Sequence, residues 1–171
     1  MDLTKMFGIK DLIGGMQLRA ACGCHQGKKR NNNEDNLYFD GSYMNSDNHG
    51  LPSIEKTVLS LDDDGFFCVF DGMGGGDYGE VASYTASKTT KEFLETGTNI
   101  NPCDITPSLT KMCEVVNQAV YEAGEKLGSS RMGSTLVGLY FHEGQTWVCN
   151  LGDSRCYFLR DGRMKQISED H

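Results

Sequence analysis

The stretch CVFDGMGGGDYGEVAS, residues 68–83, places a carboxylate at the start of a glycine-rich turn. An apolar segment leads into Asp71, and a helix-like run follows the glycines. A glycine-rich turn between a strand and a helix often binds phosphate through its backbone amides, but Asp71 would repel a bare phosphate. A carboxylate fixed at the end of a buried strand, beside backbone carbonyls exposed by the turn, is instead a ligand set suited to Mg²⁺ or Mn²⁺.

Two known phosphate-binding patterns fit this turn poorly. A P-loop needs a second glycine followed by lysine and serine or threonine, but the residue five positions after Gly72 is Asp77, and no such pair follows. The dinucleotide pattern G-x-G-x-x-G does occur, at Gly74, Gly76 and Gly79. The fold behind that pattern needs a second parallel strand, whereas two successive helices are predicted here, so nicotinamide or flavin binding is disfavoured.

Further acids stand at two other junctions of the chain. RNNNED offers Glu34 and Asp35 beside the cation Arg30, and NLGDSR offers Asp153 in a tight turn between two strands. The segment 31–42 is not a calcium-binding loop, because its sixth position lacks the glycine and its twelfth lacks the acid. Each acid alone is typical of a turn or a helix cap. Three acid-bearing junctions in one small domain, however, indicate a site for divalent cations.

The elements that must position these acids are several strands, then two helices, then a run of hairpins. Residues 42–56 are polar and contain glycine and proline, which predicts a loop. Asp40-Gly41 is typical of a turn that closes a strand, and Asp161-Gly162 is typical of a two-residue hairpin turn. This order predicts an α+β fold with antiparallel sheet. Residues 62–70 are predicted to be an acidic turn followed by a buried strand, and the other predicted strands are 16–27, 36–41, 134–141, 145–151, 155–160 and 163–168.

Two consecutive helices are expected between these groups of strands. The first covers 79–96, and the second begins with Thr106 as its N-cap and Pro107 at its first helical position. Both carry an apolar stripe at helical spacing, which predicts core packing. In the second helix the stripe consists of Leu109, Met112, Cys113, Val116, Val120, Ala123 and Leu127.

Composition limits the classes of function. The 171 residues suit one domain, and the net charge of −8 argues against non-specific binding to nucleic acid or to an anionic membrane surface. No apolar run approaches the roughly 18 residues of a membrane span. The seven cysteines are odd in number, which indicates reduced thiols and a cytoplasmic protein. Cys22, Cys24 and His25 form half a metal site, and a second half with matching spacing is missing.

A series of short motifs resembles those of a known enzyme family. In order they are RNNNED, VFDGMGG with the following GEVAS, GSTL, NLGDSR and the terminal SEDH. The series is similar to the motifs of the metal-dependent serine/threonine protein phosphatases of type 2C, and the methionine after DG resembles the bacterial branch. The resemblance runs from about Arg30 to His171. It suggests a leading segment over 1–15 and a partial phosphatase catalytic domain over 16–171.

This resemblance implies a sandwich of two packed antiparallel sheets flanked by helix pairs, with a metal site at the edge between the sheets. There Asp71 would bridge two Mg²⁺ or Mn²⁺ ions, and Gly72 would offer its backbone carbonyl. Glu34 would bind one ion, and Asp35 would act mostly through a metal-bound water. Asp153 would lie nearby, where some members of the family bind a third ion.

The same resemblance implies an activity and a substrate. Arg30 would hold the substrate phosphate, since a guanidinium suits bidentate contact with phosphoryl oxygens. The two ions would activate a water that attacks phosphoserine or phosphothreonine. The implied partner is a phosphorylated protein of the kind that a cognate serine/threonine kinase produces. Nucleic acid and membranes are not expected as partners.

Two departures from the family pattern change what is expected of this chain. Met73 cannot donate a proton to the leaving group. The chain also stops at His171, before the two later aspartates that complete the family's metal set. We therefore expect the isolated chain to be inactive or nearly so, and to self-associate through an unpaired sheet edge. The alternative is a non-catalytic module that binds a phosphoprotein or another partner through the same groove.

Overall fold

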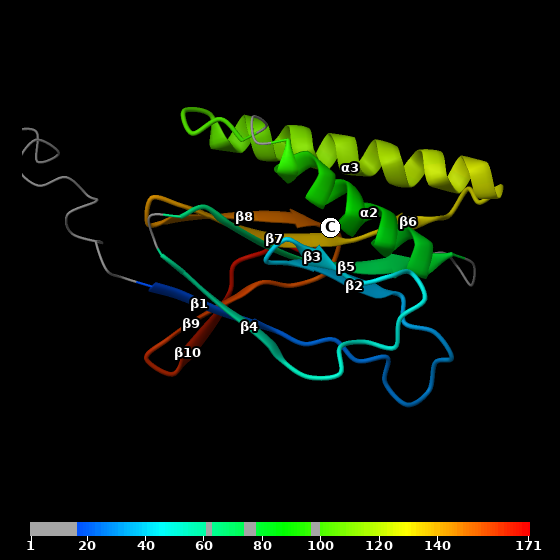
Figure 1. Cartoon of the computed structure of the whole chain (residues 1–171), viewed down its shortest axis with the longest axis horizontal. Helices are drawn as coiled ribbons and strands as arrows, with labels where there is room; N and C mark the ends of the chain where they lie inside the picture. The colour runs from blue at the N-terminus through cyan, green and yellow to red at the C-terminus, as the bar shows by residue number, and fades with distance from the viewer. Residues whose placement is uncertain (1–16, 61–62, 74–77, 97–99) are drawn as a thin grey trace, which may run out of the picture.

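The computed structural model describes residues 17–60, 63–73, 78–96 and 100–171, which form one large sheet, two small sheets and a helix pair (Figure 1). The helices are α2 (Gly79–Glu95) and α3 (Ile105–Leu127). The strands are β1 (Gln17–Cys22), β2 (Asp35–Phe39), β3 (Ser42–Tyr43), β4 (Glu55–Ser60), β5 (Gly65–Met73), β6 (Gly133–Ser134), β7 (Leu136–His142), β8 (Gln145–Leu151), β9 (Tyr157–Arg160) and β10 (Arg163–Gln166).

The large sheet has six antiparallel strands in the order β3-β2-β5-β7-β8, with β6 paired to the end of β5. The pair α2 and α3 covers one face of this sheet (Figure 1). The opposite face is met by two separate two-stranded antiparallel sheets, β1-β4 and the hairpin β9-β10. The predicted α+β class with antiparallel sheets is confirmed. The second layer of the expected sandwich is divided into two pairs of strands among the described residues.

The central strand β5 presents a different kind of residue to each face of the large sheet. Phe66, Cys68 and Phe70 are buried toward the helices, as the strict alternation of side chains along a strand requires. The intervening residues Val69 and Asp71 point to the other face and are exposed. One strand therefore supplies both the core and the candidate site.

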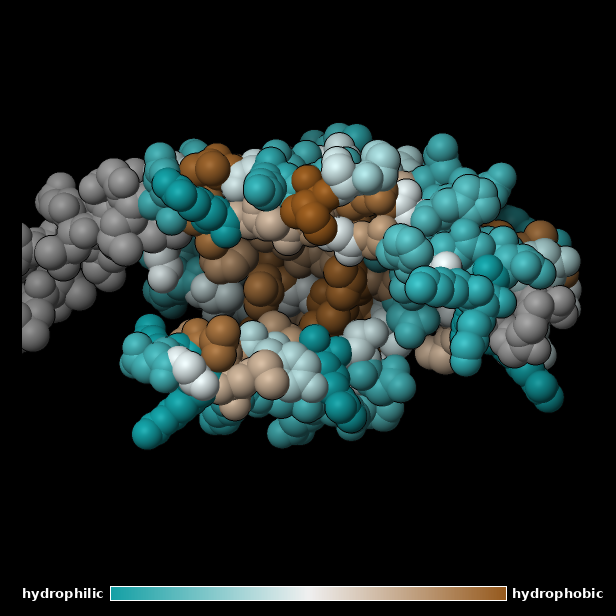
Figure 2. Space-filling view, turned by 90° about the horizontal axis from the view of Figure 1, so that it is seen from below, coloured by the Kyte–Doolittle hydropathy of each residue, from teal (hydrophilic) through white to brown (hydrophobic). Residues whose placement is uncertain are grey.

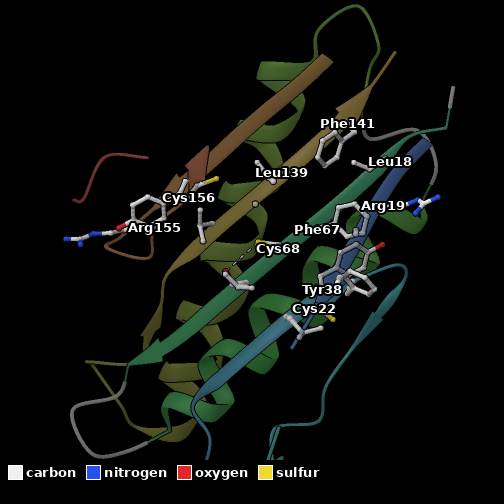
Figure 3. Close-up of a pocket in the computed structure, with 18 residues that line it drawn as sticks. Leu18, Arg19, Cys22, Tyr38, Phe67, Cys68, Leu139, Phe141, Arg155 and Cys156 are labelled. Atoms are coloured by element: carbon white, nitrogen blue, oxygen red, sulfur yellow. Dashed lines mark hydrogen bonds between the residues drawn. The ribbon is translucent and has the colours of Figure 1, made fainter. Parts of the chain in front are cut away.

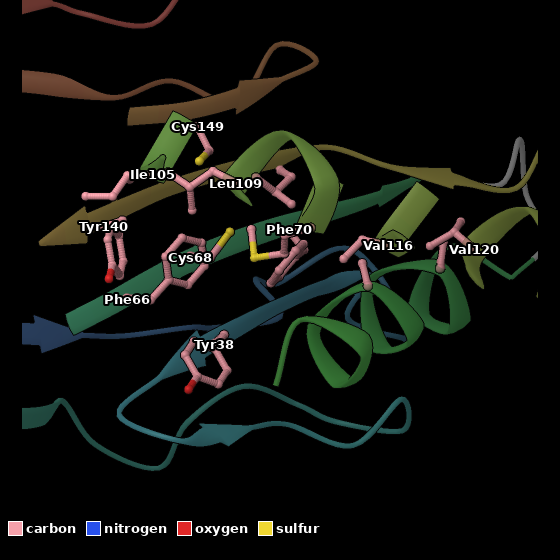
Figure 4. Packing of buried hydrophobic residues seen from close by; sticks show 14 residues of the cluster. Tyr38, Phe66, Cys68, Phe70, Ile105, Leu109, Val116, Val120, Tyr140 and Cys149 are labelled. Carbon is pink, nitrogen blue, oxygen red and sulfur yellow. The ribbon is translucent and has the colours of Figure 1, made fainter. Parts of the chain in front are cut away.

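The main core lies between the large sheet and the helices (Figure 4). Small residues on α2, above all the fully buried Ala82 and Ala86, let this helix approach the sheet closely. The stripe predicted for the second helix is buried at Leu109, Met112, Val116 and Val120, while its last member, Leu127, is 41% exposed. Burial of an aromatic or large aliphatic side chain contributes roughly 1.5–3 kcal/mol. This layer therefore holds the helices and the sheet together.

The face away from the helices carries an open apolar groove (Figure 2). A cavity of about 460 Å³ lies over β2, β5 and β7, with β1 on one side and the β9 end on the other (Figure 3). Its floor includes Leu37, Phe67 and Leu139, and its sides include Leu18 and Cys156. In the described part of the chain, β1 and β9 each pair with a single strand, so each leaves one edge unpaired.

The structure corrects two predictions about the strands. Residues 42–56, predicted as a loop, contain β3 and the beginning of β4. The turn predicted at Asp40-Gly41 is present, with positive φ at both residues, but the two-residue strand that follows it is too short to be recognised by alternation. The buried strand predicted to end near Phe70 continues to Met73, because Gly72 and Met73 pair with β6. Asp71 thus lies inside a strand.

The second helix also begins differently from the prediction. Its N-cap is Asp104, and Thr106 lies within the first turn, where its carbonyl accepts a hydrogen bond from Thr110 Oγ1. Asp104 makes no side-chain capping bond, so the periodicity of the apolar residues fixes this helix more firmly than its cap does. The leading segment 1–15 and the glycines at 74 and 76 lie outside the described residues.

Candidate functional site

Two carboxylates face each other across neighbouring strands at one end of the large sheet. In the antiparallel pairing of β2 with β5, Asp35 lies directly opposite Asp71. Paired residues of this kind project from the same face of the sheet with their Cβ atoms about 4.5–5.5 Å apart. Both side chains therefore lie on the face that carries the open groove. Two like charges held this close favour a cation between or beside them.

The electrostatics of this pair follow from its surroundings. Partial burial raises the pKa of Asp71, and the negative charge of Asp153 raises it further, while Arg30 lowers it. Partial burial also raises the pKa of Asp35, and the neighbouring charge of Asp71 adds to that rise. The acids of the three junctions thus act on one another. A divalent cation would relieve this repulsion.

The backbone of Gly72 lies close to the side chain of Glu34. The Gly72 amide donates to the carbonyl of Glu34 at 2.9 Å. A Cβ added to Gly72 would lie 1.9 Å from the Gly79 carbonyl oxygen, so only glycine fits there. A Cβ added to Gly79 would lie 2.9 Å from the Gly72 carbonyl oxygen and 3.0 Å from Glu34 Cδ. The two glycines thus bring a carboxylate and a backbone carbonyl around one point.

Arg30 lies at the rim of this cluster and forms an ion pair with Glu34. Its side chain is 67% exposed, whereas that of Glu34 is only 20% exposed. The Arg30 carbonyl accepts a hydrogen bond from Gln26 Nε2 at 2.8 Å, which fixes the backbone of the loop. The guanidinium is therefore anchored by one acid and retains exposed N–H groups.

The turn that carries Asp153 is fastened to the end of the chain. The His171 amide donates to the Gly152 carbonyl at 3.1 Å, and Asn150 Nδ2 donates to the carbonyl of Glu169. Arg155 Nε donates to both carboxylate oxygens of Asp170, at 3.1 and 3.0 Å. The motifs NLGDSR and SEDH, separate in sequence, are thus parts of one structural unit beside the site.

Buried hydroxyls near Asp71 were not among the predicted site residues. Thr135 is 3% exposed, and its Oγ1 accepts a hydrogen bond from the Asp71 amide at 3.0 Å. The same oxygen lies 2.7 Å from Ser154 Oγ. GSTL was one of the motifs that carry the family resemblance, but nothing in the sequence indicated a role for its threonine.

The donors present suit a hard divalent cation in their chemistry. A hollow of about 310 Å³ is lined by residues that include Asp35, Asp71 and Ser154. Carboxylate and carbonyl oxygens are the ligands that Mg²⁺ and Mn²⁺ prefer. Among the residues that the structure describes, however, no three His, Cys, Asp or Glu side chains converge closely enough to hold a metal ion by themselves. The cluster therefore offers a partial set of ligands.

Cys24 and His25 line the same hollow. Asn33 Nδ2 donates a hydrogen bond to Cys24 Sγ at 3.1 Å, and the Gly27 amide donates one to His25 Nδ1 at 2.8 Å. Cys22 packs against the smaller apolar cluster around Leu37. All seven cysteines are free thiols.

None of the helices in the described ranges combines the length and the apolar character that a membrane span requires.

The sequence model of the family described as "Protein phosphatase 2C" matches residues 39–171. The chain belongs to the protein phosphatase 2C family. The matched region includes Asp71, Gly72 and Asp153, and it begins after Arg30, Glu34 and Asp35. Membership explains the order of motifs along the chain.

Bacterial relatives extend the match. The serine/threonine phosphatase stp of Listeria welshimeri is 32% identical over 148 residues, which cover 85% of this chain and 52% of the relative. The serine/threonine protein phosphatase PstP of Mycobacterium tuberculosis is 30% identical over 156 residues, 90% of this chain and 25% of the relative. The chain thus spans about half the length of the first of these relatives, and less of the second.

Solved structures agree with the fold. The catalytic domain of PstP in complex with two manganese ions superimposes with a TM-score of 0.64 at 26% identity. The superposition covers 90% of this chain and 56% of that domain. A bacterial serine phosphatase gives a TM-score of 0.67 at 24% identity, over 90% of this chain and 55% of the other. The described residues therefore adopt a large part of the phosphatase fold.

Proposed function

We propose that this chain is part of a metal-dependent phosphatase that hydrolyses phosphoserine and phosphothreonine in proteins. The observation that carries the proposal is the apposition of Asp35 and Asp71 across β2 and β5, with Glu34 and the Gly72 carbonyl grouped beside them. Family membership and the names of the relatives support the same activity. Residues 16–171 would then be a partial catalytic domain in the cytoplasm, preceded by a leading segment over 1–15.

The residues of this chain divide into metal ligands and a phosphate ligand. Asp71 and the Gly72 carbonyl would hold Mg²⁺ or Mn²⁺, with Glu34 on one ion and Asp35 acting through water. Asp153 would hold a third ion. When bound, the ions supply a nucleophilic water at neutral pH and neutralise negative charge on the phosphoryl group.

Arg30 would bind and orient the phosphate of the substrate. Its ion pair with Glu34 places the guanidinium directly beside the carboxylate and carbonyl oxygens of the cluster. Engagement of Glu34 by a cation would weaken that pair and release N–H groups for bidentate contact with phosphoryl oxygens. The substrate phosphate and the metal ligands would thus share one rim of the site.

We expect the described acids to hold a second ion poorly, because no three His, Cys, Asp or Glu side chains among the described residues converge. A hard cation with few protein ligands keeps most of its water and binds weakly. We therefore expect the isolated chain to bind at most one Mn²⁺ measurably and to lack phosphatase activity. We also propose that it self-associates through the open edges of β1 and β9, since an unpaired strand edge is a template for another strand.

The test is an assay of the isolated chain against a phosphothreonine peptide in millimolar Mn²⁺, with Mn²⁺ binding measured by calorimetry and mass by sedimentation. One weak Mn²⁺ site without turnover is the expected result. Turnover that equals that of a complete phosphatase and disappears with chelator would show that the ligand set is finished within this chain or by a second copy. Binding of the phosphopeptide without any Mn²⁺ binding would favour the non-catalytic phosphoprotein-binding module.

A further inference from the structure

The buried hydroxyl of Thr135 interrupts the backbone pairing next to Asp71. Pairing of β5 with β7 ends at Val69 opposite Val137, and pairing with β6 resumes at Gly72 opposite Ser134. The register is the same on both sides of the interruption, so Thr135 stands opposite Asp71. The Thr135 amide still donates to the Asp71 carbonyl at 2.9 Å. The Asp71 amide, however, donates to Thr135 Oγ1, at 3.0 Å, in place of a backbone carbonyl.

The same hydroxyl also reaches the turn that carries Asp153. Thr135 Oγ1 shares a hydrogen bond of 2.7 Å with the hydroxyl of Ser154, the residue directly after Asp153. One buried oxygen thus connects the backbone of Asp71 with the neighbour of Asp153. These two acids lie close enough for the charge of one to raise the pKa of the other.

The methyl group of Thr135 packs against the same turn that carries Asp153. A Cβ added to Gly152 would lie 2.8 Å from Thr135 Cγ2, so the turn approaches the threonine as closely as a glycine permits. Gly152 also has a φ of 93°, which favours glycine. Both branches of the Thr135 side chain therefore make contacts. The hydroxyl bonds to Asp71 and Ser154, and the methyl group packs against Gly152.

We propose that Thr135 is a positioning residue that sets the placement of Asp71 relative to Asp153, and thereby the affinity of the site for divalent cations. The inference rests on the metal-binding function proposed above. Groups that hold a ligand in place without touching the metal change metal affinity by about 10–100-fold when they are lost. Loss of the Thr135 hydroxyl is expected to have an effect in this range.

The experiment compares two substitutions that separate the branches of the side chain. Thr135→Val keeps the volume and the methyl contact with Gly152 but removes the hydroxyl. Thr135→Ser keeps the hydroxyl and removes the methyl group. Thr90→Val is the matched control, because Thr90 is fully buried and its hydroxyl donates to the Ala86 carbonyl within α2, at 2.9 Å. Each variant of the full chain is titrated with Mn²⁺ by calorimetry.

Thr135→Val should weaken Mn²⁺ binding by about 10-fold or more, while Thr135→Ser should bind within about threefold of the parent. Thr90→Val should lower thermal stability and leave Mn²⁺ affinity unchanged. A Thr135→Val variant with the affinity of the parent overturns the proposal. So does a Thr135→Ser variant as weak as Thr135→Val, because the hydroxyl would then not be the cause.

Backbone amide exchange distinguishes failure of this inference from failure of the proposed function. Thr135→Val should speed exchange of the Asp71 amide and change exchange at Asp153 and Ser154, and Thr90→Val should leave all three unchanged. If the parent chain binds no Mn²⁺, the proposed metal-binding function is contradicted, and the positioning role of Thr135 is then tested by amide exchange alone. An Asp71 amide that exchanges equally in parent and Thr135→Val would then overturn the positioning role.

Discussion

The two faces of the large sheet differ in how completely they are covered. Toward α2 and α3, Phe66 and Phe70 of β5 are 6% and 1% exposed. On the opposite face the alternate residues of the same strand meet only the separate pairs β1-β4 and β9-β10, and Val69 is 48% exposed. Asp71 continues this second series. Alternate side chains of this strand thus point into the core on one face and toward the candidate site on the other.

The open face itself has two parts. An apolar groove of about 460 Å³ and an acidic hollow of about 310 Å³ both include Leu37 and Val69 in their walls. The helices already exclude water from the core on their side of the sheet. On the open face, both the apolar floor of the groove and the acids of the hollow are accessible to solvent. Any segment or partner that covers the groove would therefore also lie beside the candidate site.

The largest expected effect is on the covered face. Phe70→Ala should lower the free energy of unfolding by about 3–5 kcal/mol, because it removes a buried aromatic side chain and leaves a cavity. Val69→Ala, one residue earlier, should cost less than about 1 kcal/mol, since half of that smaller side chain already lies in solvent. Urea denaturation of both variants measures the difference. Equal losses would mean that the two faces contribute alike to stability.

Asp71→Asn tests the chemistry of the open face. In a protein that carries the whole catalytic domain, this change should reduce Mn²⁺-dependent hydrolysis of p-nitrophenyl phosphate by at least about 100-fold. The loss of a group that only holds a metal ligand in place already lowers metal affinity or activity by about 10–100-fold.

Asp64→Asn is the control for Asp71→Asn at the other end of β5. Asp64 accepts a hydrogen bond from Tyr140 and contacts His142, far along the strand from the acidic cluster. Its replacement should leave activity nearly unchanged. Retained activity in Asp71→Asn, or equal losses in both variants, would remove Asp71 from the metal site.

The features that the sequence predicted well are local. The apolar period of α3 and the turn at Asp161-Gly162, where both residues have positive φ, depend on residues close together in the chain. The pairing of β1 with β4 joins Gln17 to Ser60, and no local pattern indicates which segments meet at that distance. The beginning of β4 was accordingly predicted as part of a loop.

For the candidate site, the sequence suggested residues but gave no information on their connections. The motifs identified the acids and Arg30 through their resemblance to a family, and the pairing of β2 with β5 brings Asp35 opposite Asp71. The hydroxyl that holds Asp71 comes from a residue 64 positions later, and its partner Ser154 from 19 positions beyond that. Such a chain of contacts appears only when three strands have been placed side by side.

Arg30→Ala tests whether phosphate and metal are held by separate groups on the open face. Substrate affinity should fall, because the exposed guanidinium is the proposed phosphate ligand, while Mn²⁺ affinity should change little. Calorimetric titration with Mn²⁺ and the KM for a phosphothreonine peptide separate the two effects. A large loss of Mn²⁺ binding would instead assign Arg30, through its ion pair with Glu34, to the structure of the acidic cluster.

The smallest expected effect is a change in thermal stability: Asp71→Asn should stabilise the metal-free protein relative to the parent. Burial and the charge of Asp153 raise the pKa of Asp71 above its unfolded value, so the ionised carboxylate disfavours the metal-free fold. The folded state then binds more protons than the unfolded state between the ordinary and the raised pKa, and stability rises as the pH falls through that window. In chelator at neutral pH, Asp71→Asn should therefore have a higher Tm than the parent.

Mn²⁺ in excess should invert this order, because a ligand that binds only the folded state adds stability that grows with the logarithm of the ratio of its concentration to its Kd. The parent should then have the higher Tm, and its gain should exceed that of Asp71→Asn. Met73→Leu is the control on the same strand, since Met73 is 54% exposed and carries no charge. It should follow the parent in both conditions. If Asp71→Asn lowers Tm in chelator, the acid supports the fold without metal, and the division of β5 into a face that stabilises the fold and a face that carries the candidate site does not hold at Asp71.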